Sequence, residues 1–196
     1  MNLVERAKNI IVTPKTEWPV IASETSNTQQ IMVTYILPLT VLVAIANIIG
    51  WGVIGSVYTS FKWGIAMGLV QFFSIFISIF IGSLVINALA PNFESTKDSG
   101  RAMQLVAYSY TPSLVGGMLA IFPVIGWIGT LFGIYGLYLL YLGLPTMMKT
   151  PKDKVPIYFI ISLVVMVIVY WLIAMVLTSI FLAAFGLSIY GLSGAY

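Results

Sequence analysis

The residues that could carry chemistry in this sequence are few and mostly uncharged. There is no histidine and no cysteine, which removes Ser-His and thiol nucleophiles and the usual ligands of zinc and haem. The six acidic residues all lie outside the long apolar segments, so an intramembrane aspartyl protease or a proton or sodium relay has no carboxylate to use. No glycine-rich phosphate loop with its lysine is present. We therefore expect no enzymatic activity, cofactor, metal or nucleic-acid partner.

Neutral polar side chains are what the apolar segments offer instead. In lipid such groups commonly pair across helices, at about 0.6 kcal/mol each. The alternative is that they line a narrow polar path or a groove for lipid headgroups. The candidate residues of this polar bundle interior are Asn47, Gln71, Ser74, Ser78, Tyr108 and Ser109.

Composition indicates the class of protein that must position these residues. The chain is 60% hydrophobic and only 8% charged, which a soluble protein of 196 residues could not accommodate without exposing large apolar patches. The sequence predicts an all-α integral membrane bundle of five transmembrane helices. The expected spans are about 31–54, about 64–89, two within 102–148, and about 157–185. In this division, residues 1–30 form a cytoplasmic or interfacial amphipathic segment, 31–185 the membrane domain, and 186–196 a short extracytoplasmic tail.

The stretch 102–148 predicts a tight helical hairpin with a turn at Phe122-Pro123-Val124. Small residues recur at helical spacing in both arms, while Trp127, Leu131 and three tyrosines occupy the opposite face of the second arm. Because membrane helices associate through close backbone approach, we expect the arms to pack along these faces, with Gly133 touching the first arm near Gly116. The alternatives are that the stripe mediates a homodimer, or that glycine is simply frequent in membrane helices. The predicted packing stripe is Ser109, Ser113, Gly116, Ala120, Gly126, Gly129, Gly133, Gly136 and Gly143.

The N-terminal segment Asn2–Val12 predicts a short amphipathic helix. Leu3, Val4, Ala7, Ile10 and Ile11 fall on one face, and Asn2, Glu5, Arg6, Lys8 and Asn9 on the other. The segment is too short and too charged to be a span or a signal peptide. It could lie on the membrane surface or cap the cytoplasmic face of the bundle itself.

Basic residues predict the orientation. Eight of the nine lie before the first span, between the second and third, or between the fourth and fifth, and only Lys62 lies on the other side. The N-terminus is therefore expected in the cytoplasm and the C-terminus outside. Trp51, Trp63 and Trp127 would then lie near the outer interface.

Three segments of the sequence carry a family resemblance. They are Ala107-Tyr108-Ser109-Tyr110-Thr111-Pro112, Tyr135-Gly136-Leu137-Tyr138-Leu139-Leu140-Tyr141-Leu142-Gly143-Leu144-Pro145, and Ile11-Val12-Thr13-Pro14 followed by Trp18. The first two resemble motifs of the prokaryotic branch of the Yip family, named for Ypt/Rab-interacting proteins of the eukaryotic secretory pathway, and the third is similar to the lead-in of bacterial members. The resemblance implies five spans, a cytoplasmic N-terminus, and self-association or partner binding rather than catalysis. Eukaryotic members carry an Asp-Leu-Tyr-Gly-Pro type motif on a longer arm. This chain has neither, so we do not expect a Rab-like GTPase partner.

Two hypotheses of function follow. In the first, the protein is a non-catalytic scaffold or adaptor in the plasma (inner) membrane of a prokaryote, with the lipid bilayer and other membrane proteins or a second copy as partners. In the second, it is a small transporter, channel or lipid-handling protein with a neutral polar path through the bundle.

Overall fold

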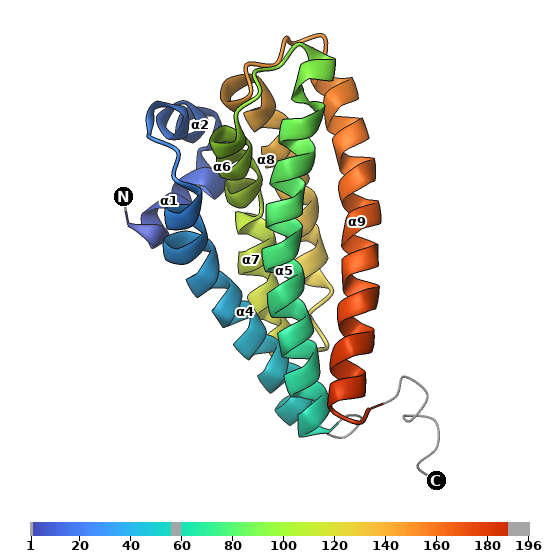
Figure 1. Cartoon of the computed structure of the whole chain (residues 1–196). Coiled ribbons are helices and arrows are strands. Elements are labelled where there is room, and N and C mark those ends of the chain that lie inside the picture. Colours follow the sequence, from blue (N-terminus) through green and yellow to red (C-terminus); the bar gives the residue numbers. More distant parts are fainter. Residues whose placement is uncertain (1, 56–59, 188–196) are drawn as a thin grey trace.

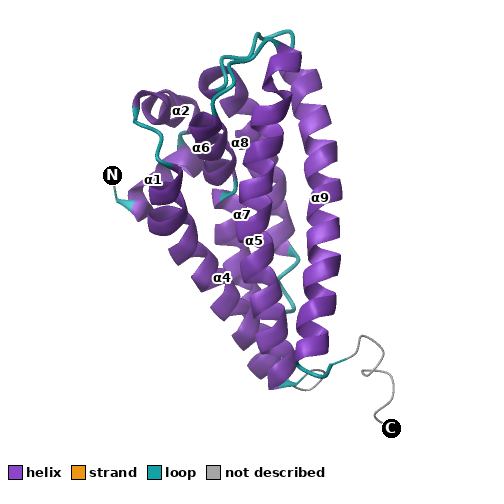
Figure 2. Cartoon of the chain, in the orientation of Figure 1, coloured by secondary structure: helices purple, strands orange, loops and turns teal. Residues whose placement is uncertain are grey.

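A computed structural model describes residues 2–55 and 60–187, and every regular element in these ranges is helical (Figure 2). The expected all-α architecture is therefore confirmed. Most of the predicted tail, 188–196, lies outside the described residues. The elements are α1 (Leu3–Val12), α2 (Pro14–Ser23), α3 (Thr28–Gln30), η1 (Ile31–Ile36), α4 (Leu37–Ile49), η2 (Gly50–Ile54), α5 (Phe61–Leu89), η3 (Ala90–Phe93), α6 (Ser99–Ser109), α7 (Thr111–Gly117), η4 (Met118–Ile121), α8 (Ile128–Met147) and α9 (Val155–Ala184).

Within residues 2–55 and 60–187, four continuous helices are long and apolar enough to cross a membrane. They are Thr28–Ile54, Phe61–Phe93, Ile128–Met147 and Val155–Ala184. The first is not a uniform α-helix, because π-helical turns, η1 and η2, flank α4 at both ends. These helices make the chain a multi-pass membrane protein by length and composition.

The segment expected to be the third span is divided instead of continuous. It consists of α6, α7 and the 3₁₀ turn η4, with α6 ending at Ser109 and α7 beginning at Thr111. Pro112 lacks an N–H and its ring crowds the preceding turn, so the α-helical hydrogen-bond ladder cannot run through this point. The sequence therefore predicted where this helical segment lies, but not that it is broken into two α-helices and a 3₁₀ turn.

Helix α5 lies at the centre of the bundle, where it contacts α4, α6 and α9 (Figure 1). Its approach to the first span depends on glycine. A Cβ at Gly64 would lie 2.5 Å from Gly52 Cα, and one at Gly68 would lie 3.0 Å from Ala44 O. The two backbones are thus in direct contact, which is the way small residues join helices in lipid.

Helix α9 is peripheral. Within it only Val155, Tyr158, Ser162 and Leu182 are buried, and much of its outer surface is apolar and exposed. Its 30 residues, at a rise of about 1.5 Å each, exceed a hydrocarbon core of about 30 Å, so the helix must tilt or protrude.

The helices α1 and α2 form a short hairpin that packs against the flank of the bundle at α6, α7 and α8 (Figure 1). Trp18 and Ile21 are buried at this contact, and the Tyr135 hydroxyl on α8 donates a hydrogen bond to Ile11 O at 2.7 Å. The hairpin is therefore part of the folded bundle, and contact of its outer surface with the membrane stays a prediction.

Candidate functional site

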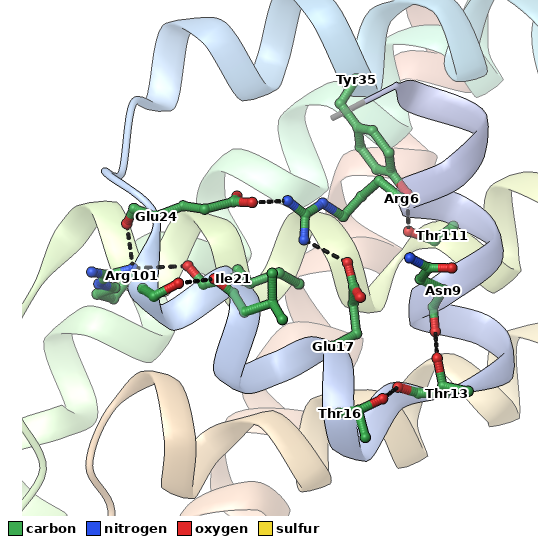
Figure 3. A network of polar contacts seen from close by, with 12 residues as sticks. Arg6, Asn9, Thr13, Thr16, Glu17, Ile21, Glu24, Tyr35, Arg101 and Thr111 are labelled. Carbon is green, nitrogen blue, oxygen red and sulfur yellow. Dashed lines mark hydrogen bonds and ion pairs between the residues drawn. The ribbon is translucent and has the colours of Figure 1, made fainter.

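The first polar region is an ionic cluster beneath the α1–α2 hairpin, formed by Arg6, Glu17, Glu24 and Arg101 (Figure 3). Arg6 donates from Nη1 to Glu17 Oε1 at 2.6 Å and from Nη2 to Glu24 Oε1. Arg6 and Glu17 are only 4% and 5% exposed, so the two helices are joined through a buried ion pair. Charge-assisted bonds of this kind fix geometry as well as contribute free energy.

Arg101 extends the cluster onto α6. Its Nη1 donates to Ile21 O at 3.1 Å and Glu24 O at 2.9 Å, and to Gln104 Oε1 at 2.9 Å. It thereby satisfies carbonyl groups at the C-terminal end of α2, where a cation is favoured by the helix dipole. The end of the hairpin is thus fixed to the bundle.

Aromatic residues cover the other side of Arg6. The guanidinium carbon lies 5.4 Å from the centroid of the Tyr108 ring, within the range of a cation–π contact. Tyr108 packs edge-on against Tyr35, with the ring centroids 4.9 Å apart. The Tyr35 hydroxyl lies 2.7 Å from Thr111 Oγ1 (Figure 3). A polar cavity of about 440 Å³ opens beside these groups, between Leu3, Arg6, Glu24, Gln30, Tyr35 and Tyr108.

The placement of Arg6 corrects our prediction for the N-terminal helix. Arg6 was assigned to the polar face, but it is buried, while Val4 and Val12 of the same helix are 68% and 66% exposed. The sequence did hold a signal, because Arg6 and the fully buried Ile10 are four residues apart and share one side of the helix. The partners Glu17 and Glu24 could not be found this way, since their contact with Arg6 depends on the hairpin.

The second polar region is a lateral cavity of about 340 Å³, bounded by α5, the α6–α7 segment, α8 and α9. Its polar lining residues are Gln71, Ser109, Tyr110, Ser113 and Tyr170, and the remainder of its wall is apolar side chains together with Gly133 and Gly136.

The predicted polar interior is thus divided among several places. Gln71 and Ser109 meet at the lateral cavity, whereas Tyr108 belongs with the ionic cluster. Asn47 donates from Nδ2 to Val43 O of its own helix at 2.9 Å. Ser74 and Ser78 are buried on α5. The six residues therefore lie in different parts of the bundle, and a polar path through it stays a prediction.

The predicted packing stripe is also divided. A Cβ at Gly129 would lie 2.8 Å from Gly116 O, and one at Gly136 would lie 2.7 Å from Ser109 O, so α8 touches the α6–α7 segment at these two points. Gly133, for which we expected the contact near Gly116, has only Ser113 Oγ within 4 Å of its Cβ position, at 3.7 Å. It faces the lateral cavity.

Three outer members of the stripe make other contacts. Gly126 lies in the turn before α8, and not on the helix. Gly143 faces Leu105 and the ring of Trp18, where a Cβ would lie 2.8 Å from Trp18 Cε2. Ala120 lies in η4, and its carbonyl oxygen is directly against Gly50. The sequence pattern did not show that α2 packs against Gly143, or that the first span packs against Ala120.

Comparison with known proteins gives a match to one family. A family model described as the Yip1 domain matches residues 8–174. This range includes the lateral cavity and three residues of the ionic cluster, Glu17, Glu24 and Arg101, while Arg6 lies just before it. Searches of curated proteins and of solved structures returned no match.

Proposed function

The chain belongs to the Yip1 domain family, and from this premise we propose that it is a non-catalytic membrane scaffold or adaptor that binds other membrane proteins or shapes the bilayer. The observation that carries the proposal is the ionic cluster. Its charges are engaged with one another and with backbone carbonyls, so they hold the α1–α2 hairpin to the bundle. Arg6 and Glu24 also line the polar cavity beside the cluster.

A fixed hairpin presents a defined outer surface. Val4 and Val12 are exposed there beside the exposed Lys8 and Lys15, so apolar and basic groups lie on one small unit. Such a mixture suits a protein partner or an anionic membrane surface. We propose this surface as the docking region of the scaffold.

Site-specific photo-crosslinking tests the scaffold role. A photoreactive residue at Lys8 or Lys15 should give discrete protein adducts in cells, and one at Ile168, on the exposed face of α9, serves as the control. Adducts that are no more discrete at the hairpin than at Ile168 would overturn the docking proposal.

For the membrane arrangement, we propose five crossings, with the N-terminus cytoplasmic and the C-terminus outside, in the plasma (inner) membrane of a prokaryote. Residues 99–121 would make the additional crossing, since 23 residues at a rise of about 1.5 Å reach about 35 Å. The distribution of basic residues supports the orientation.

Labelling of single cysteines tests that orientation. A cysteine at Ser99 or Asp153 should be shielded from a membrane-impermeant thiol reagent in intact cells, and a cysteine at the exposed Val124 should react. The reverse pattern would contradict the argument from basic residues.

We propose the lipid bilayer and other membrane proteins, or a second copy of the chain, as partners, and no Rab-like GTPase.

A second candidate function, a small transporter, channel or lipid-handling protein, is favoured by the lateral cavity. Dye-release and lipid-scrambling assays on reconstituted vesicles separate the two. Flux that Gln71→Leu abolishes would support the second candidate, and absence of flux supports the scaffold.

A further inference from the structure

We propose that the lateral cavity is a binding site for one chain of an uncharged lipid that carries a hydroxyl or carbonyl group. The proposal concerns binding alone and does not rest on the scaffold role. A lipid held there could be a structural ligand of a scaffold or the cargo of a lipid-handling protein.

The first argument is an unused hydrogen-bonding group. Ser109 lines the cavity and is only 5% exposed. Its Oγ nevertheless has no hydrogen-bond partner among the described residues. A buried hydroxyl left unsatisfied costs about 1–3 kcal/mol. A ligand hydroxyl or carbonyl would satisfy it once rotation about χ1 turns the hydroxyl toward the cavity. Gln71, half-buried in the same wall, can both donate and accept.

The second argument is the broken helix. Ser109, Tyr110 and Ser113 line the cavity at the junction of α6 and α7, where Pro112 interrupts the hydrogen-bond ladder. The interruption is local, because Tyr110 keeps right-handed helical dihedral angles, its N–H donates to Val106 O at 3.1 Å and its carbonyl accepts from Leu114 N at 3.0 Å. Discontinuous membrane helices commonly form ligand sites.

The chemistry of the wall limits the ligand. None of the described residues lining the cavity is charged, so a phosphate or carboxylate would be buried without a counter-charge, at high cost. Apolar side chains from α5, α8 and α9 make up most of the wall, which suits an alkyl or isoprenoid chain. An uncharged lipid with a single polar function therefore fits better than an intact phospholipid.

Size and access agree with one chain entering from the bilayer. A volume of about 340 Å³ is at the small end of ligand pockets. Val167 and Trp171 of α9 form part of the wall, and these residues are 46% and 67% exposed, so the cavity reaches the outer surface of the bundle. The open position beside Gly133 provides room that a side chain would fill.

Photolabelling of the delipidated full chain in detergent tests the site. The probe is a fatty alcohol with a diazirine in its chain, and the fatty methyl ester and the fatty acid of equal length are competitors. We expect saturable labelling on peptides that contain residues 106–114, 133–140 or 163–171. The alcohol and the ester should compete at least tenfold better than the ionised acid. Preference between alcohol and ester tells whether the site accepts from a hydroxyl or donates to a carbonyl.

Variants distinguish this cavity from the general apolar surface. Gly133→Leu fills the space and should lower labelling at least tenfold, and Val167→Trp at the exposed rim should do the same if the first variant fails to fold. Ser109→Ala should weaken binding about fivefold, the worth of one hydrogen bond. Leu131→Ala, which lies on the exposed opposite face of α8, is the control and should leave labelling unchanged.

Three outcomes would overturn the proposal. They are equal labelling of the wild type and of both folded blocking variants, labelling spread over the exposed face of α9, and equal competition by the ionised acid. Saturable binding with no lipid movement in reconstituted vesicles would support the proposal and leave the scaffold role intact. Binding together with scrambling would support it and favour the second candidate function.

Discussion

The ionic cluster and the lateral cavity are both polar regions inside a mostly apolar bundle, but they treat their polar groups in opposite ways. In the cluster, Arg6 is held by two carboxylates and an aromatic ring. In the cavity, the polar groups are neutral, and Ser109 Oγ has no partner among the described residues. In the cluster the buried charges are paired, although a polar cavity opens beside them, whereas in the lateral cavity a buried hydroxyl has no partner among the described residues.

The difference follows from the cost of burying each kind of group. A buried charge without a partner is far more costly than a buried hydroxyl without one, so charges are retained in such a fold only as complete sets. A neutral hydroxyl can remain unpaired at a small cost and stay available to a ligand. The charged region is therefore suited to holding structure, and the neutral region to binding.

The largest effect is expected where a charge of the cluster is removed. Arg6→Met should lower the free energy of unfolding by about 3–5 kcal/mol, because it leaves Glu17 buried without its partner. Thermal unfolding in detergent measures the loss, and hydrogen exchange should show the α1–α2 hairpin opening first.

Two controls sharpen this prediction. Lys8→Met removes an exposed charge of the same helix and should change stability little. Arg6→Met combined with Glu17→Met should recover part of the loss, since an apolar pair can replace a buried ion pair. Equal effects of Arg6→Met and Lys8→Met would mean that the cluster does not hold the hairpin.

A smaller effect is expected at the glycines of α8. Gly129→Ala and Gly136→Ala should each cost about 1–3 kcal/mol, because the new methyl group would meet a backbone carbonyl oxygen at 2.8 Å or 2.7 Å. Gly133→Ala faces the lateral cavity and should be neutral, or stabilise by up to about 1 kcal/mol through helix propensity. Melting temperatures in detergent compare the three. If Gly133→Ala costs as much as the other two, Gly133 is a packing residue and the cavity is narrower than the structure shows.

The sequence predicted the class of fold because composition and helical periodicity are local signals. The long spans α5 and α9 could be located from their apolar residues alone, and the small residues of α8 indicated a close helix contact. Which glycine makes the contact could not be predicted, because it depends on how far one helix slides along the other. A shift of one turn places Gly129, and not Gly133, against Gly116.

The residues of the two polar regions differed in how far the sequence alone could identify them. Gln71 and Ser109 could be identified as neutral groups in apolar segments, although their meeting at one cavity requires the packed bundle. The cluster was hidden, because charged residues near an N-terminus are usually solvated. Arg6 meets Glu17 and Glu24 only after α1 and α2 fold back on each other.

The buried hydrogen bond between Tyr35 and Thr111, beside the ionic cluster, should have an effect on stability between that of Arg6 and that of Ser109. Tyr35→Phe removes the hydroxyl that lies 2.7 Å from Thr111 Oγ1, both residues being buried. We expect a loss of about 1–2 kcal/mol in unfolding free energy, since the Thr111 hydroxyl is left unpaired. Thr111→Val should cost a similar amount, and the double variant should cost clearly less than the sum. Strict additivity would mean that the two hydroxyls do not interact.

The smallest effect is expected at Ser109, and it tests the comparison most directly. Its Oγ has no hydrogen bond to lose among the described residues, so Ser109→Ala removes a desolvated hydroxyl and leaves the packing almost unchanged. In delipidated protein the variant should be as stable as the wild type or more stable, by up to about 1 kcal/mol. When the fatty alcohol is added, the wild type should gain more thermal stability than the variant, because a ligand that binds only the folded state stabilises it more when it binds more tightly, with the logarithm of its affinity. Melting temperatures without and with the alcohol measure the stability of the delipidated protein and the stabilisation by the ligand. A clear loss of stability in the delipidated variant would mean that Ser109 already has a partner inside the bundle, and the polar groups of the lateral cavity would then be paired, as the charges of the ionic cluster are.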